Sequence, residues 1–156
     1  MKIIQIMKIA RQRISKQSSA GFSLIEIMIA ITILGLVMAL VGTNVLKRLD
    51  EAKVQTAKNQ IKALEGALQD YYRENAMYPT TDQGLNALVE KPTAGKIPKN
   101  WNADGYLSKG KVPQDPWTND FVYKCDDGYH FEIISRGSDG EEGGEGIAAD
   151  INSKDL

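Results

Sequence analysis

Residues 22–46 are FSLIEIMIAITILGLVMALVGTNVL, an apolar run from which most of the architecture can be inferred. Only one side chain in this run, Glu26, is ionisable. As an α-helix the run would extend about 37 Å, which is enough to cross the hydrocarbon core of a bilayer. We therefore expect residues 22–46 to form a membrane-spanning helix.

A basic segment precedes the apolar run. Residues 1–21 contain five basic side chains and no acidic one, whereas the rest of the chain has the other 14 basic residues and all 20 acidic residues. Positive charge before an apolar helix favours a cytoplasmic N-terminus, although Lys47 and Arg48 follow the run at its other end. The acidic remainder of the chain gives no reason to expect nucleic-acid binding.

The order of these two segments differs from that of an ordinary secretory signal, in which the apolar region lies before the cleavage site. Here the basic segment ends in SSAG at residues 18–21, and the apolar run follows directly. Cleavage after Gly21 would remove a basic leader, residues 1–21, and keep the membrane helix. Either Met1 or Met7 could be the true start of translation.

Glu26 is an unusual residue for an apolar helix. A carboxylate inside a membrane helix costs about 2 to 3 kcal/mol on insertion scales, so it is a functional candidate. Cleavage after Gly21 would also create a positive amine on Phe22. Glu26 of one subunit could neutralise the Phe22 amine of its neighbour, which would turn two burial costs into a preference for assembly. The alternative is that Glu26 extends to the lipid headgroups.

The sequence GFSLIE at residues 21–26, placed before a long apolar helix, resembles the type III signal of type IV pilins and pseudopilins. This resemblance implies that a prepilin peptidase cuts after Gly21 and methylates Phe22. It also implies that Glu26 is the glutamate that acts in assembly. Relatives commonly have proline at the position of Thr43, where the helix unwinds in the filament, so unwinding is not implied here without it.

An amphipathic pattern continues beyond the membrane segment. Ala57, Ile61, Leu64, Leu68 and Tyr71 or Tyr72 follow helical spacing, with charged residues between them. The pattern predicts one helix over about residues 22–75, its second half packed on a domain formed by residues 47–156. A second, short helix is expected at residues 82–90, where Thr80 and Thr81 can cap its start.

Two short strands are predicted after that helix, at residues 121–125 and 129–135, with Asp126, Asp127 and Gly128 as the hairpin turn. Tyr129, Phe131 and Ile133 alternate as one apolar face, and His130 on the other face is predicted to be structural. Cys125 is the only cysteine, which excludes an internal disulfide. We expect it to be a buried small apolar residue, the alternative being a reactive thiol.

Two further stretches narrow the resemblance. YPTTDQGLNALVEKP at residues 78–92 and PQDPWTNDFVY at residues 113–123 resemble regions of the major pseudopilins of type II secretion systems. Type IV pilins usually close with a disulfide loop, which a single cysteine excludes. The resemblance implies an α+β, pilin-like fold in which one long N-terminal helix packs on a small antiparallel sheet.

The same resemblance implies a function. The chain would be a subunit of a helical homopolymer in the periplasm that drives folded proteins across the outer membrane. Expected partners are minor pseudopilins, the prepilin peptidase, the inner-membrane assembly platform and the membrane itself. A type IV pilin or competence pseudopilin is the nearest alternative, and a membrane-tethered periplasmic enzyme or binding module is a second. No nucleophile with a base, no carboxylate pair and no transition-metal cluster supports an enzyme.

The C-terminal sequence RGSDGEEGGEG, residues 136–146, combines flexible glycines with carboxylates, which suits calcium. A disordered acidic tail is the alternative. The resemblance implies a structural calcium held by Asp139, Asp150 and the backbone carbonyl of Arg136. Many relatives have another acid just before the final Asp-Ile, where this chain has two alanines. The candidates to compensate for it are Glu141 and Glu145.

Overall fold

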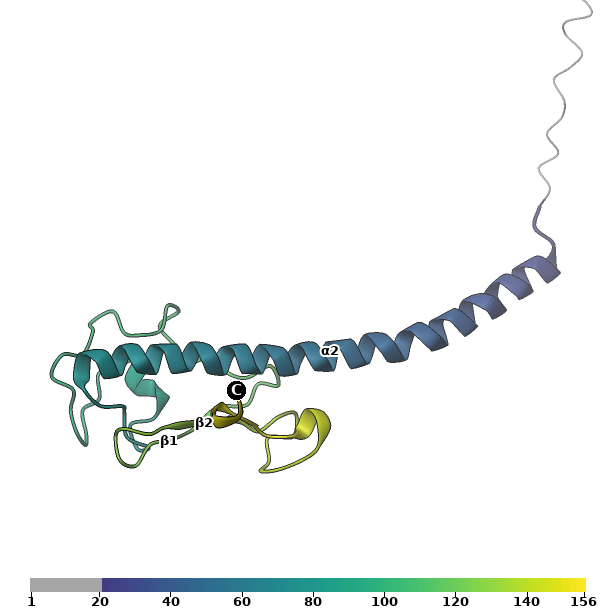
Figure 1. The fold of residues 1–156 in the computed structure, drawn as a ribbon. Helices are drawn as coiled ribbons and strands as arrows, with labels where there is room; N and C mark the ends of the chain where they lie inside the picture. The colour runs from purple at the N-terminus through teal and green to yellow at the C-terminus, as the bar shows by residue number, and fades with distance from the viewer. Residues whose placement is uncertain (1–20) are drawn as a thin grey trace, which may run out of the picture. The chain divides into compact units, whose positions relative to one another are not determined.

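The computed structural model describes residues 21–156, apart from the side chains of residues 40 and 42–44. The predicted leader, except Gly21, and both candidate start residues lie outside the described residues. Within them are helix α2 (Leu24–Asn75), strands β1 (Val122–Lys124), β2 (Glu132–Ser135) and β3 (Ile151–Asn152), and 3-10 helices η1 (Leu85–Leu88), η2 (Gly146–Ala148) and η3 (Ser153–Asp155) (Figure 1).

Helix α2 confirms the predicted long helix, with both ends set by local chemistry. It begins at Leu24 because Ser23 caps it: the Ser23 Oγ accepts the Glu26 N–H at 3.2 Å, and the Ser23 carbonyl accepts the Ile27 N–H at 3.2 Å. At the other end Ala76 has a φ of 56°, the left-handed conformation that commonly terminates helices. Its N–H donates to the Tyr72 carbonyl at 2.7 Å and closes the last turn.

The described residues divide into two units between Thr43 and Asn44, and α2 contributes to both. Among the residues whose placement is described, no helix has the length and the apolar content that a bilayer crossing requires. The predicted membrane segment, residues 22–46, includes the side chains that are not described, and it stays a prediction.

The core of the second unit contains the predicted stripe of α2. Ala57, Ile61, Leu64, Leu68 and Tyr71 are all 0 or 1% exposed, which confirms the helical spacing and selects Tyr71 over Tyr72. They pack in one cluster with η1 and with residues of all three strands, and Figure 1 shows this half of α2 lying along the sheet. Burial, with Tyr106 close by, raises the pKa of Tyr71 to about 12.

The sheet has the order β1-β2-β3 with both pairs antiparallel, and Val122 faces Ile134 across the first pair. Both predicted strands are shorter than expected. The Asp127 carboxylate accepts the N–H groups of Tyr129 at 2.7 Å and His130 at 2.8 Å, which holds the connection out of the ladder. Tyr129 is therefore 57% exposed, and the prediction that it shares an apolar face with Ile133 is wrong.

His130 and Cys125, the two residues of this hairpin discussed in the sequence analysis, differ in their exposure to solvent. His130 is exposed, and its Nδ1 lies 2.6 Å from the Asp127 carboxylate, which keeps the pKa of Asp127 well below its usual value. Cys125 is 2% exposed, so the prediction of a buried residue is confirmed. Its backbone makes two hydrogen bonds with Thr81: the Cys125 N–H donates to the Thr81 hydroxyl, and the Thr81 N–H donates to the Cys125 carbonyl.

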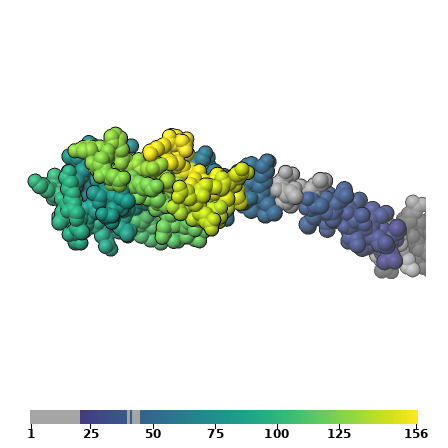
Figure 2. Space-filling view, turned by 90° about the horizontal axis from the view of Figure 1, so that it is seen from below, coloured from purple at the N-terminus to yellow at the C-terminus, as the bar shows by residue number. Residues whose placement is uncertain are grey.

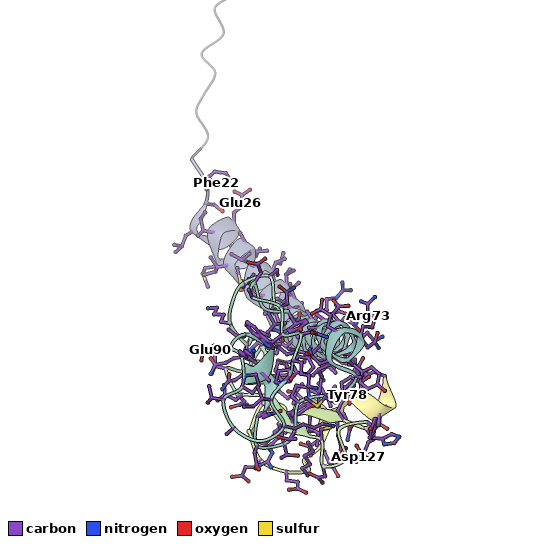
Figure 3. All side chains as sticks on the ribbon, turned by 90° about the vertical axis from the view of Figure 1, so that its left-hand side faces the viewer. Phe22, Glu26, Arg73, Tyr78, Glu90 and Asp127 are labelled. Atoms are coloured by element: carbon purple, nitrogen blue, oxygen red, sulfur yellow. The ribbon has the colours of Figure 1, made fainter. Side chains whose placement is uncertain are left out.

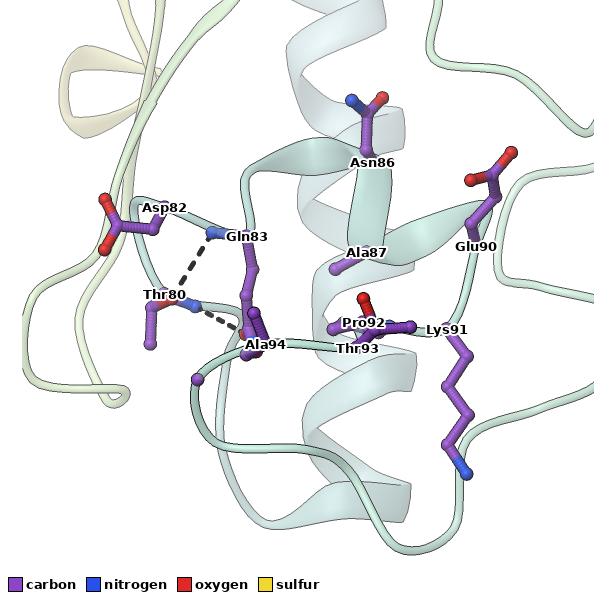
Figure 4. Close-up of a pocket in the computed structure, with 11 residues that line it drawn as sticks. Thr80, Asp82, Gln83, Asn86, Ala87, Glu90, Lys91, Pro92, Thr93 and Ala94 are labelled. Atoms are coloured by element: carbon purple, nitrogen blue, oxygen red, sulfur yellow. Dashed lines mark hydrogen bonds between the residues drawn. The ribbon is translucent and has the colours of Figure 1, made fainter.

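The predicted helix at residues 82–90 is shorter than expected and is the 3-10 helix η1. The predicted cap by Thr80 or Thr81 is wrong, because Gly84 lies before η1 and no side chain caps it. Thr80 instead bonds Gln83 in the preceding turn: the Thr80 hydroxyl accepts the Gln83 N–H, and the Gln83 side chain accepts the Thr80 N–H (Figure 4). Gly84 then takes a φ of 61°, which ends any α-helical course there. Between this turn and residues 91–95 lies an open groove of about 380 Å³.

Candidate functional site

The predicted processing and assembly residues lie together at the start of α2. Phe22 and Glu26 project from this end of the helix (Figure 3), and Phe22 is 77% exposed. Within the described residues the Glu26 side chain makes no hydrogen bond or ion pair, while its backbone is held by Ser23. Residues 23–26 also have the pattern Ser-x-x-Glu, which is the sequence of a capping box. In the sequence analysis Glu26 was considered only as an assembly residue, and this pattern was not used.

Apolar side chains surround the first part of α2. The large apolar residues that are exposed there are Phe22, Leu24, Ile25, Ile27, Met28, Ile29, Ile31, Ile33, Leu34, Leu36, Val37, Met38, Val41, Val45, Leu46 and Leu49. Amphipathic helices bury one stripe, whereas a helix that is apolar on every side needs a covering of lipid or of other helices. This part of the chain is therefore built for contact outside its own subunit.

The C-terminal segment, residues 136–150, closes on itself and does not form the disordered tail considered above. The Ser138 N–H donates to the Ile147 carbonyl at 3.0 Å, and Gly143 and Asp150 are joined by two hydrogen bonds of 3.1 Å. We call residues 136–150 the C-terminal loop; in Figure 2 the last residues of the chain, in yellow, gather on one part of the domain surface.

Glycines make this closure possible. Gly137 and Gly144 both have positive φ, and a Cβ on either would lie within 2.7 Å of the Ala148 carbonyl oxygen. Only glycine can let two backbone segments approach so closely.

The predicted calcium ligands all belong to the C-terminal loop. The Asp150 Oδ2 accepts the Gly143 N–H, but its Oδ1 is buried and has no hydrogen-bond partner. The Asp139 Oδ1 accepts the Glu141 N–H at 3.1 Å, and the Arg136 carbonyl accepts the Gly140 N–H at 3.2 Å.

The two candidates to compensate for the missing acid, Glu141 and Glu145, are both exposed. Within the described residues no three acidic, histidine or cysteine side chains are grouped as metal ligands. A calcium here would thus depend on two aspartates with backbone carbonyls and water, a mixture that calcium accepts.

Two residues that support this loop were missed by the sequence analysis. Asp115 is only 4% exposed, and its carboxylate accepts hydrogen bonds from the Ser135 hydroxyl at 2.7 Å and from two backbone N–H groups. Asn119 donates from its side chain to the Gly137 carbonyl at 2.9 Å. An aspartate that starts a turn in Asp-Pro-Trp-Thr-Asn was the available signal for Asp115.

The end of the chain is fastened to β2. The Glu132 carboxylate accepts a hydrogen bond from the Asn152 side chain and pairs with Lys154 at 3.2 Å. These contacts, the Asn152 bond first, lower the pKa of Glu132. The Ile133 N–H also donates to the Ser153 hydroxyl at 3.0 Å. The C-terminal loop therefore starts directly after β2 and is followed by residues that are bound to β2.

Both parts of the chain, the N-terminal segment and the domain that follows it, are similar to known proteins. Residues 44–154 match the family model for type II secretion system protein G, and residues 16–42 match the prokaryotic N-terminal methylation motif. The chain is 48% identical to type II secretion system core protein G of Pseudomonas aeruginosa, over 90% of this chain and 98% of that one. It is 43% identical to core protein G of Vibrio cholerae, over 90% and 94%.

A solved structure supports the same relationship. The crystal structure of the major pseudopilin from the type 2 secretion system of enterohaemorrhagic Escherichia coli superimposes with a TM-score of 0.62 at 38% identity. The match covers 72% of this chain and 96% of that one. Fold and N-terminal motif together define a pilin-like subunit with a prepilin-type start.

The chain belongs to the protein G family of type II secretion systems. It is a structural subunit of the pseudopilus. The predictions of a major pseudopilin and of an α+β pilin-like fold are confirmed.

Proposed function

We propose that the chain polymerises through its apolar helix into a periplasmic filament whose growth drives folded proteins across the outer membrane. The observation that carries this proposal is the apolar surface on all sides of the first part of α2, where Glu26 is the one ionisable residue between residues 22 and 46. Side-by-side packing of such helices would keep that surface out of water and replace its lipid contacts by van der Waals contacts between helices.

Before assembly, the same helix would hold the subunit in the inner membrane with its N-terminus in the cytoplasm. The prepilin peptidase would remove the leader, and the inner-membrane platform would add the subunit to a filament that also contains minor pseudopilins. We propose a structural role without catalysis, which the names of the relatives support. A type IV pilin or competence pseudopilin is less well supported, because the family match covers residues 44–154.

Mass analysis of the N-terminus tests the processing step. Protein extracted from membranes is expected to start at Phe22 and to carry one methyl group on its amine. Intact and peptide mass spectrometry would distinguish this form from the precursor by the missing leader. A native chain that retains the leader in assembled filaments would contradict the proposal, and protein from cells without the prepilin peptidase provides the unprocessed control.

We also propose that the C-terminal loop binds a structural calcium through Asp139, Asp150 and the Arg136 carbonyl. The support is the buried Asp150 Oδ1, which has no hydrogen-bond partner and would otherwise stay unsatisfied at a cost of about 1–3 kcal/mol. Bound calcium would supply positive charge to these oxygens. Glu141 and Glu145 are the two exposed acids that could approach the same ion.

Removal of calcium is expected to lower the melting temperature of the protein by about 10 °C, because saturating ligand adds about 2.7 kcal/mol at 100 times its dissociation constant. Differential scanning calorimetry of the full chain in detergent, with EGTA and then with excess calcium, would measure this. Asp150→Asn should lose the calcium-dependent shift, whereas Asp155→Asn, at an exposed acid in η3, should keep it. Identical transitions with and without calcium would reject the site.

A further inference from the structure

A tight turn at residues 115–119 lies beside the C-terminal loop. The Asp115 N–H donates to the Asn119 carbonyl at 2.9 Å, and the Thr118 N–H donates to the Asp115 carbonyl at 3.0 Å. Inside the turn, the Asp115 Oδ1 accepts the N–H groups of Trp117 at 3.0 Å and Asn119 at 2.8 Å. Asp115 is in turn fixed by the Ser135 hydroxyl at the end of β2. The turn is therefore rigidly attached to the sheet.

The Asn119 side chain extends from this turn to two points on the C-terminal loop. Its Nδ2 donates to the Gly137 carbonyl at 2.9 Å. Its Oδ1 lies against Gly140, where an added Cβ would be 3.2 Å away. One amide from an element outside the loop thus bonds the Gly137 carbonyl and faces Gly140, the two glycines that flank Ser138 and Asp139.

These contacts matter because the segment from 137 to 140 is intrinsically loose. Gly137 and Gly140 both have positive φ, and glycines lose more conformational freedom on ordering than any other residue. Within the loop, the segment is held by only two backbone bonds, from Ser138 to Ile147 and from Gly140 to Arg136. A site whose ligands are ordered beforehand binds more tightly, since binding need not order them.

We infer that Asn119 is a positioning residue for the cation site: it holds the segment from Gly137 to Gly140 so that Asp139 and the Arg136 carbonyl are already arranged for calcium. The inference rests on the proposed calcium site. Asn119 itself bonds the Gly137 carbonyl and is not assigned as a ligand. Positions 148 and 149 are alanines, so the site has fewer acidic ligands. Holding the remaining ligands in place before calcium binds compensates for this in part.

The test compares Asn119→Ala with the matched control Asn100→Ala in the full chain in detergent. Asn100 also donates a side-chain hydrogen bond to a backbone carbonyl, that of Glu74 at 3.3 Å, but far from the loop in the sequence. Isothermal titration with calcium chloride should show about tenfold weaker binding for Asn119→Ala and unchanged binding for the control. In EGTA, amide hydrogen exchange at Ser138 and Gly140 should be faster in Asn119→Ala alone.

Each result supports or overturns the inference. If Asn119→Ala lowers the melting temperature but binds calcium as tightly as wild type, Asn119 has only a structural role and the inference is wrong. If wild type itself binds no calcium, the proposed calcium site fails and the inference fails with it. Tenfold weaker binding together with faster exchange confined to the loop would establish the positioning role.

Discussion

Glu26→Ala should give a protein that is processed normally but forms about one-hundredth of the wild-type amount of filament. Removing one partner of a buried ion pair costs about 3 kcal/mol or more, because the other charge, here the Phe22 amine of a neighbour, stays buried without compensation. Such a cost corresponds to about a hundredfold loss in association. Shearing filaments from cells that express the secretion system, followed by immunoblotting of the sheared and membrane fractions, measures the yield.

The structure makes this variant easy to interpret. The Glu26 carboxylate has no partner among the described residues, and the first turn of α2 is capped by the Ser23 hydroxyl through the backbone of residue 26. Alanine keeps that backbone bond, so the helix itself should persist. Glu51→Ala, at an exposed acid further along α2, is the control and should assemble normally. Wild-type filament yield from Glu26→Ala would remove the assembly role assigned to this residue.

Gly21→Val should leave nearly all of the protein as unprocessed precursor. The resemblance of GFSLIE to the prepilin signal implies cleavage after Gly21, and a branched side chain there would obstruct the approach of the peptidase to the bond before Phe22. Immunoblots of whole cells would show a single band, larger than the mature protein by the mass of residues 1–21. No filament should form, since the basic leader cannot enter a packed apolar core.

A folding defect does not account for that outcome. An added Cβ at Gly21 meets no atom within 4 Å, so the rest of the described chain has no contact to lose. Gly66→Val provides the matched control, because Gly66 is an exposed helical glycine where an added Cβ is equally unobstructed. This control should be processed to the mature size. Mature protein from Gly21→Val at normal levels would show that cleavage occurs elsewhere.

The parts of the fold that could be predicted are those with strong local patterns. The stripe from Ala57 to Tyr71 repeats over five positions, and each of them is buried. Thr80 followed three residues later by Gln83 is a local pattern that could have indicated the turn before η1, where the two residues exchange hydrogen bonds. Ser23 and Glu26 are spaced in the same way, so the start of α2 could also have been inferred from the sequence.

The parts that were missed depend on contacts between distant residues. Strand β3 contains two residues, too few to show alternation, and it exists because Ile151 pairs with Ser135. No local pattern indicates that Asn119 contacts Gly137, 18 residues away. The helix expected at residues 82–90 is shorter in the structure, because Gly84 has a φ of 61° and the chain turns there.

The burial of Cys125 affects whether subunits of a polymer can become cross-linked by disulfide bonds. In the oxidising compartment proposed for the filament, thiols on neighbouring molecules become cross-linked whenever they meet. Each subunit has one thiol, and only 2% of its residue is reached by solvent. Burial therefore keeps the Cys125 thiols of neighbouring subunits from forming disulfide bonds with one another.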